Sequence, residues 1–198
     1  MTETIKKFAK ISGWAALVAF VLQCIIFGVK NVIEGNDFFS KGQTLFEYAG
    51  SAITASAAFM WLFNKWLWKW KPLNMITGKI PVLACKYTGT LRFIWAEQEQ
   101  TRNTEIVVTQ TYLTVSVSLG TNESHSDSIT AAIKKEDNHY KLIYTYLNTP
   151  NGNLQSRSAI HNGTAILRID NPNHLEGNYY TDRLTRGFMD LKAVETNE

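Results

Sequence analysis

Residues 112–119 have the sequence Tyr-Leu-Thr-Val-Ser-Val-Ser-Leu, and this stretch decides the fold class of the larger part of the chain. Its leucines and valines alternate with threonine and serine. In an extended backbone the apolar side chains therefore occupy one face and the hydroxyls the other. That period of two predicts a half-buried β-strand at this point rather than a helix.

Similar short runs, rich in β-branched and aromatic residues, continue on both sides of this strand. They are separated by turn formers such as Asn148-Thr-Pro-Asn-Gly152. Eight short strands with short links predict an antiparallel meander that closes into a small barrel, with a β-sandwich as the alternative. A barrel of this size is filled by side chains or holds one small ligand. The predicted strands are residues 86–95, 104–110, 112–119, 126–135, 140–148, 162–170, 174–181 and 186–194.

The first third of the chain is apolar and basic instead. Residues 11–29 are uncharged, and residues 45–67 are interrupted only by Glu47 and Lys65. A helix needs about 20 apolar residues to cross a bilayer, so two transmembrane helices are predicted. A cleaved signal peptide is the alternative for the first stretch, but its apolar core is usually about 7–15 residues and ends at a small-residue cleavage site. A buried helix of a soluble protein is the alternative for the second.

The flanks of these stretches predict their orientation. Lysines precede the first stretch and follow the second, whereas the loop between them has balanced charges. This bias places both termini in the cytoplasm of a multi-pass membrane protein. Four tryptophans gather at the end of the second stretch, as they do where a helix leaves a bilayer. They are Trp61, Trp66, Trp68 and Trp70.

Three parts are therefore expected: a two-helix transmembrane region at 1–71, a non-helical linker at 72–80, and a cytoplasmic ligand-binding β-barrel at 81–198. Residues 72–198 carry one more acidic than basic residue, which counts against a face that binds DNA or RNA polymers. Small residues four apart in the second stretch, such as Thr54 and Ala58, allow close helix packing. That packing is either self-association or contact with the first helix.

No catalytic motif stands out. The chain has no Gly-x-Ser-x-Gly, no His-Glu-x-x-His and no Gly-rich phosphate loop. The four histidines lie near ends of predicted strands, at spacings unlike those of a zinc site; they are His125, His139, His161 and His174. We therefore expect a non-enzymatic protein without a metal or a cofactor, although a hydrolase with Asp or His at the barrel mouth stays open.

Two segments have the composition of a nucleotide-binding surface. One is Lys86–Arg92 and the other is Leu175–Gly187, and both mix tyrosine, threonine, glycine and arginine. Aromatic faces stack on nucleobases, and arginine binds phosphate through two parallel hydrogen bonds. The same residues are also ordinary components of β-hairpins, so the composition alone leaves both interpretations open.

The order of parts resembles one protein family over essentially the whole chain. Two short spans precede a compact barrel that opens with Tyr87-x-Gly89-Thr90 and closes with Gly177-x-Tyr-Tyr-Thr-x-Arg-x-Thr-x-Gly187. This pattern is similar to the transmembrane minimal-β-barrel effectors of bacterial cyclic-oligonucleotide-based antiphage signalling (CBASS). The resemblance implies a cytoplasmic barrel that binds a cyclic dinucleotide made by a partner synthase during infection. It further implies that the bound ligand promotes homo-oligomerisation of the helices, disruption of the inner membrane and death of the infected cell.

The alternative function for the same architecture is a membrane-anchored barrel that carries a lipid or another hydrophobic ligand, and that function predicts an interior without arginine. Alternation means that the candidate binding residues cannot all face the interior. Arg168 is an alternative inward cation. The candidate ligand-binding residues are Tyr87, Thr90, Arg92, Tyr112, Tyr144, Tyr180, Thr181 and Arg183.

Overall fold

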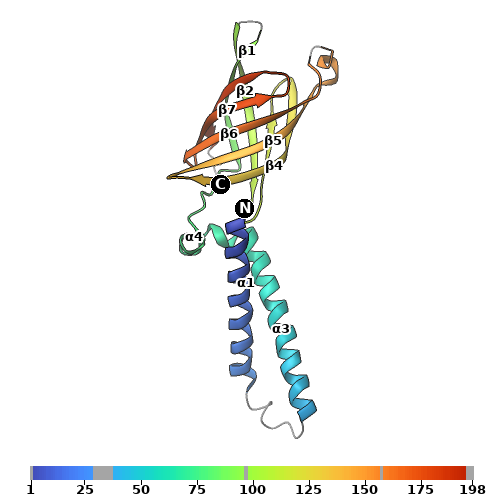
Figure 1. Ribbon diagram of the computed structural model, residues 1–198, viewed down its shortest axis with the longest axis vertical. Helices are drawn as coiled ribbons and strands as arrows, with labels where there is room; N and C mark the ends of the chain where they lie inside the picture. Colours follow the sequence, from blue (N-terminus) through green and yellow to red (C-terminus); the bar gives the residue numbers. More distant parts are fainter. Residues whose placement is uncertain (1, 29–37, 96–97, 157, 195–198) are drawn as a thin grey trace. The chain divides into compact units, whose positions relative to one another are not determined.

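The computed structural model of the protein describes residues 2–28, 38–95, 98–156 and 158–194. The chain divides into two compact units, residues 1–77 and residues 78–198. Helices make up the first unit and a β-barrel the second (Figure 1).

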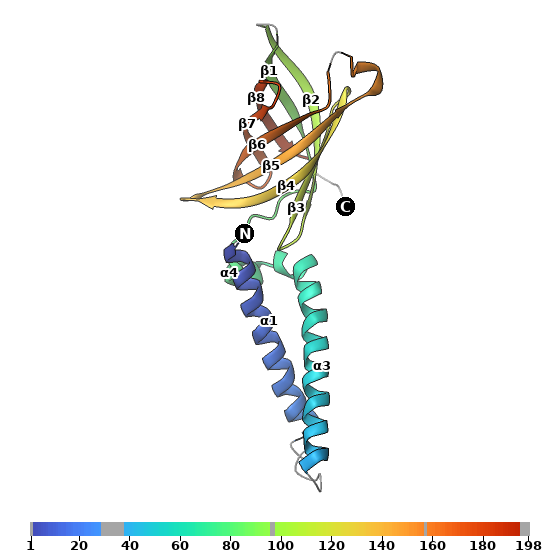
Figure 2. The same ribbon diagram turned by 45° about the vertical axis from the view of Figure 1, so that its right-hand side comes forward.

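The first unit is a helical hairpin. It begins with α1 (Thr2–Gln23), which continues into a π-helical turn, η1 (Cys24–Gly28). α3 (Phe38–Lys65) runs beside α1 in both views (Figure 1, Figure 2). A short 3₁₀ turn, η2 (Leu67–Lys69), and a seven-residue helix, α4 (Lys71–Thr77), follow.

One face of α3 packs against α1 with the chain direction reversed. The Phe8 and Phe63 ring centroids lie 6.3 Å apart, and the Ser56 hydroxyl donates to the Ser12 carbonyl at 3.3 Å. The pairs therefore run in opposite order along the two helices. The residues that α3 buries in the hairpin recur every three or four positions, as expected for one helical face; they are Ala52, Ser56, Met60 and Phe63.

The expectation of two membrane spans has to be corrected. Among the described residues, one helix, Glu3–Ile26, is long and apolar enough to cross a membrane by length and composition. The second predicted span, residues 45–67, is helical as far as Lys65 but does not reach the same hydropathy. Its alanines, serines, threonines and glycine, together with Glu47, lower the average.

The linker prediction also has to be corrected. Residues 72–80 were expected to be non-helical because of Pro72, Gly78 and the following Pro81, yet residues 71–77 form α4. Pro72 occupies the first turn of that helix, where proline is tolerated because its missing N–H would have no helical partner there. The helix ends at Gly78, whose φ of 124° is outside the helical region.

The second unit is a closed barrel of eight antiparallel strands in sequence order, β1 to β8, with β1 hydrogen-bonded to β8. Closure leaves no strand edge unpaired, which confirms the predicted barrel over the β-sandwich. Register shifts occur at Ser128/Thr130 and Arg168/Asn171. The strands are β1 (Lys86–Trp95), β2 (Gln98–Gln110), β3 (Val115–Gly120), β4 (Ser124–Glu136), β5 (His139–Pro150), β6 (His161–Asn171), β7 (His174–Thr181) and β8 (Arg186–Ala193).

The inward-facing side chains fill one end of the barrel and leave the other end hollow. On β5, Leu142 and Tyr144 are buried at 0% and 2% exposure, and their inward neighbours Tyr146 and Asn148 continue toward the open end. At the filled end, strands all around the barrel contribute side chains to an apolar core. Its fully buried side chains include Tyr87, Ile106, Leu142, Leu167, Leu175 and Leu191.

The stretch 112–119 behaves as predicted from Val115 onward. Val117 and Leu119 are buried and Ser116 is exposed, so the apolar face is inside. The strand begins three residues later than predicted, because residues 111–114 form a turn in which the Thr111 amide donates to the Thr114 carbonyl at 2.8 Å.

Candidate functional site

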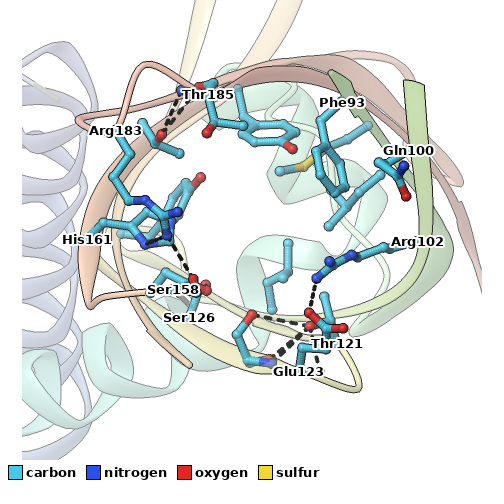
Figure 3. Close-up of a pocket in the computed structure, with 18 of the residues that line it drawn as sticks. Phe93, Gln100, Arg102, Thr121, Glu123, Ser126, Ser158, His161, Arg183 and Thr185 are labelled. Carbon is cyan, nitrogen blue, oxygen red and sulfur yellow. Dashed lines mark hydrogen bonds and ion pairs between the residues drawn. The ribbon is translucent and has the colours of Figure 1, made fainter. Parts of the chain in front are cut away.

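The hollow end of the barrel is a cavity of about 350 Å³, which falls within the range of small-ligand sites. The strand ends, the β3–β4 and β7–β8 turns and the segment between β5 and β6 form its walls (Figure 3). The lining mixes aromatic, hydroxyl and charged side chains. It includes Phe93, Gln100, Arg102, Glu123, Ser126, Tyr144, Tyr146, Asn148, Ser158, His161, Tyr179, Thr181, Arg183 and Thr185.

Two arginines enter the cavity from opposite walls (Figure 3). Arg102 comes from β2, forms an ion pair with Glu123 of the β3–β4 turn, and has its guanidinium carbon 5.3 Å from the Phe93 ring centroid. Arg183 comes from the β7–β8 turn and donates to the Ser158 hydroxyl at 2.8 Å. The cavity therefore presents two separate guanidinium groups, each able to form paired hydrogen bonds to an oxyanion.

Tyrosine rings form flat walls between the arginines, and glycines opposite make room for them. A Cβ on Gly163 would lie 2.3 Å from the Tyr146 ring, and a Cβ on Gly187 would lie 2.7 Å from the Tyr179 ring. Real Cβ atoms do not approach this closely, so only glycine lets the two rings lie against the barrel wall. The Tyr144 and Tyr146 ring centroids are 5.8 Å apart, a spacing typical of packed aromatic pairs.

Burial keeps these phenols neutral. It raises the pKa of Tyr179 to about 12, although the nearby Arg102 charge opposes the rise. Burial also raises the pKa of the Tyr144 and Tyr146 hydroxyls, and the neighbouring Tyr179 adds to the rise for Tyr146. All three hydroxyls are therefore protonated at neutral pH and can act as hydrogen-bond donors.

Neutral polar groups also line the cavity. The Ser126 hydroxyl donates to the Asn148 amide oxygen at 2.8 Å, and both side chains are buried. On the opposite wall, the Thr181 hydroxyl donates to the Thr185 carbonyl at 3.3 Å and accepts from the Thr185 amide at 3.2 Å. Such groups suit a planar ligand with donors and acceptors on its edges.

The structure brings three of the eight candidate residues together in the cavity. Tyr144 lies on β5, Thr181 ends β7, and Arg183 lies in the turn that follows. Two of these three, Thr181 and Arg183, come from the closing segment that the sequence singled out.

The other five lie elsewhere. Tyr87 points inward but belongs to the packed core, where its hydroxyl donates to the Pro172 carbonyl at 2.5 Å. Tyr112 is buried beside the β2–β3 turn. The remaining three do not line the cavity: Thr90, Arg92 and Tyr180.

Alternation explains the outward positions. Arg92 stacks on Phe188 of the neighbouring strand with its guanidinium carbon 5.2 Å from the ring centroid, and Tyr180 is 49% exposed. Arg168, the alternative inward cation, instead pairs with Glu176 at 3.1 Å and is half exposed.

Sequence reasoning missed Arg102, Tyr146, Tyr179 and His161. Tyr179 could have been found, because it follows the inward Leu175 at a period of two. Arg102 gave no comparable signal, since the polar run around it was not predicted to be strand. His161 was noted only as lying near the end of a predicted strand, and its Nδ1 lies 3.5 Å from the Arg183 guanidinium.

Over the residues that the structure describes, no group of three or more His, Cys, Asp or Glu side chains could hold a metal ion. The cavity lining offers cations, hydroxyls and aromatic faces for recognition. A ligand with two negative groups and planar rings would match it.

The comparisons with known proteins point to one family. Residues 78–193 match the family model described as Cap15, cyclic dinucleotide receptor domain. A CD-NTase-associated protein 15 from Staphylococcus schleiferi is 30% identical over 195 residues, covering 98% of this chain and all of the relative. A protein of the same name from Yersinia aleksiciae is 30% identical over 200 residues, covering 94% and 92% of the two chains. The resemblance inferred from the order of parts is thus confirmed, and the chain belongs to the CD-NTase-associated protein 15 family of CBASS effectors.

Proposed function

We propose that this protein is an antiphage effector whose barrel cavity binds a cyclic dinucleotide. The observation that carries this proposal is the pair of arginines, Arg102 and Arg183, that enter one cavity from opposite walls (Figure 3). A cyclic dinucleotide carries two phosphates on opposite sides of its ring. Each phosphate can be matched by one guanidinium through charge-assisted hydrogen bonds.

The aromatic walls supply the second requirement. Tyr146 and Tyr179 offer ring faces for which glycines leave room, and stacking on such faces contributes about 1–3 kcal/mol per base. The site needs only these two cations, so the slightly acidic composition of residues 72–198 is no obstacle. The arginines in the cavity count against the alternative of a carrier for lipids or other hydrophobic ligands.

The receptor role supports a binding function rather than catalysis. In this proposal the dinucleotide is the signal, made by a partner synthase, and the effector does not turn it over. Recovery of intact dinucleotide after incubation with the protein tests this, and a hydrolysed product would favour the hydrolase.

We further propose that the helical hairpin is embedded in the inner membrane with both termini in the cytoplasm. α1 supplies the apolar span. α3 would lie at the same depth in the membrane, because it packs antiparallel along α1. Exposed large apolar residues on both helices support this location, including Trp14, Val18, Phe46 and Ile53. Ligand binding would promote homo-oligomerisation of these helices, membrane disruption and death of the infected cell.

Calorimetry on the full chain in lipid nanodiscs tests the receptor. The panel is cyclic di-AMP, cyclic di-GMP, cyclic GMP–AMP, cyclic UMP–AMP and cyclic di-UMP, with AMP as the control that has a single phosphate. We expect saturable binding of at least one panel member and much weaker binding of AMP, which can satisfy only one arginine. A folded protein that gives no heat with the whole panel would contradict the proposal.

A further inference from the structure

Arg102 and Arg183 are held differently within the cavity. Arg183 donates to the neutral hydroxyl of Ser158, whereas Arg102 is paired with the carboxylate of Glu123 (Figure 3). Both Arg102 and Glu123 line the cavity, and their side chains are 40% and 36% exposed. One of the two phosphate-binding positions therefore already holds an internal anion.

The carboxylate occupies the part of Arg102 that a phosphate needs. One face of the guanidinium lies over the Phe93 ring, so planar recognition of an oxyanion is left to its N–H edges, and Glu123 accepts from Nη1. A doubly charged ligand that kept Glu123 in place would bring like charges close together, which is unfavourable. Phosphate binding through the Arg102 Nη1 therefore requires the carboxylate to leave.

The β3–β4 turn can release this carboxylate without unfolding, because other bonds close it. The Thr121 amide donates to the Ser124 carbonyl at 2.9 Å, and the Thr121 hydroxyl accepts from the Ser124 amide at 3.0 Å. The backbone carbonyl of Glu123 accepts from the Asn151 amide at 2.9 Å. The side chain can rotate while this framework persists.

We propose that Glu123 is an internal competitor for the ligand phosphate at Arg102, and that it raises the dinucleotide concentration at which the receptor responds. This inference rests on the proposed function and adds a residue whose role is to weaken binding. It also keeps Arg102 paired while the cavity holds no dinucleotide. Glu123 is a positioning residue for Arg102, and ligand binding exchanges one anion for another.

The test compares Glu123→Gln with wild type as full chains in nanodiscs. The titrant is the panel dinucleotide that wild type binds most tightly. Removal of the carboxylate frees the Arg102 Nη1 for the ligand phosphate, so we expect binding to tighten by about two- to tenfold. Glu123→Ala should tighten binding in the same direction, which guards against an effect peculiar to glutamine.

Glu105→Gln is the matched control, since Glu105 pairs with Lys86 at 2.9 Å and does not line the cavity. It changes the net charge equally and should alter affinity by less than about twofold. The double variant Arg102→Gln/Glu123→Gln isolates the mechanism. In the Arg102→Gln background the carboxylate has no guanidinium to occupy. The double variant should therefore bind the dinucleotide no more tightly than Arg102→Gln alone.

Three outcomes would overturn the proposal. Unchanged or weaker binding by both folded Glu123 variants would show that the carboxylate does not compete with the ligand. A gain that persists in the Arg102→Gln background would show general repulsion instead. An equal gain in Glu105→Gln would show a net-charge effect. If wild type binds no panel member, the proposed receptor function fails instead, and the two failures are distinguishable.

Discussion

Arg183 and Arg92 form a natural pair for testing the site at the scale of single residues, because one lines the cavity and the other lies outside it. Replacing Arg183 with alanine should weaken dinucleotide binding by about 1.5–3 kcal/mol, the usual contribution of hydrogen bonds to a charged group. Arg92→Ala removes only a contact with Phe188 and should leave affinity unchanged. Calorimetry measures both. Equal affinities for the two folded variants would remove Arg183 from the site.

A substitution at Gly163 tests whether the position of the Tyr146 ring matters for dinucleotide binding. A methyl group there would approach the Tyr146 ring to 2.3 Å, so the ring must swing inward and narrow the cavity. We expect Gly163→Ala to weaken dinucleotide binding by about tenfold or more and to cost about 1–3 kcal/mol of stability through overpacking. Gly152→Ala is the control, because nothing lies within 4 Å of its new Cβ. Unaltered binding by Gly163→Ala would show that the ring is not a ligand contact.

The buried tyrosines predict how stability depends on pH. Burial raises the pKa of Tyr179 and of Tyr87 to about 12 from the ordinary 10 of a free phenol. Between those values the unfolded chain loses protons that the folded chain keeps, so the free energy of unfolding falls as pH rises through that window. Below pH 10 the titration of these two tyrosines should not change the free energy of unfolding.

Urea unfolding followed by circular dichroism at pH 8, 10 and 11.5 measures this decline. Tyr179→Phe removes one titrating group from the cavity wall and should make the decline shallower. A decline of the same steepness in wild type and Tyr179→Phe would contradict the assignment.

Among elements, periodicity determined which strands could be foreseen. All eight strands form where alternation and turn formers predicted them, and β1 has the predicted bounds. β2 was placed from residue 104, but it begins at Gln98 because its polar first half is stabilised by pairing with β1 rather than by burial. That missing half contains Arg102, so the same weak local signal hid one wall of the site.

Site residues were harder to predict than elements, since an error of one residue in the alternation of a strand moves a side chain from the inside of the barrel to the outside. Tyr180 and Thr90 were chosen as candidates, whereas the structure places their neighbours Tyr179 and Leu91 in the cavity lining. Residues brought together by turns, such as Glu123 and Ser158, depend on barrel closure. No local pattern in the sequence encodes that juxtaposition.

The exposed small residues of α3 give a prediction at the scale of one helix. Ala52 and Ser56 are buried against α1, whereas Thr54 and Ala58, also four apart, are exposed and remain open for a second copy. Ala58→Leu should obstruct close helix approach and reduce ligand-induced crosslinking and cell killing. Ala57→Leu is the control, because its neighbours four residues away are Ile53 and Trp61. Equal crosslinking and killing by both variants would place self-association elsewhere.

For the whole molecule, the requirement is that ligand binding in one unit changes the association of the other. A ligand drives assembly only if it binds the assembled state more tightly than the single chain. Linkage is reciprocal, so assembly must raise ligand affinity by the same factor. The proposed mechanism therefore makes a claim about affinity as well as about killing.

We expect the full chain to bind its best panel dinucleotide at least about fivefold more tightly in densely loaded vesicles than in nanodiscs that hold one copy, within the usual range of coupling free energies. Ala58→Leu should match wild type in single-copy discs, because the barrel is untouched, and should lose the gain in vesicles. If wild type binds equally in both settings and crosslinking does not rise with ligand, the association is not coupled to binding. The helices would then be anchors, and the killing mechanism would have to lie in the barrel.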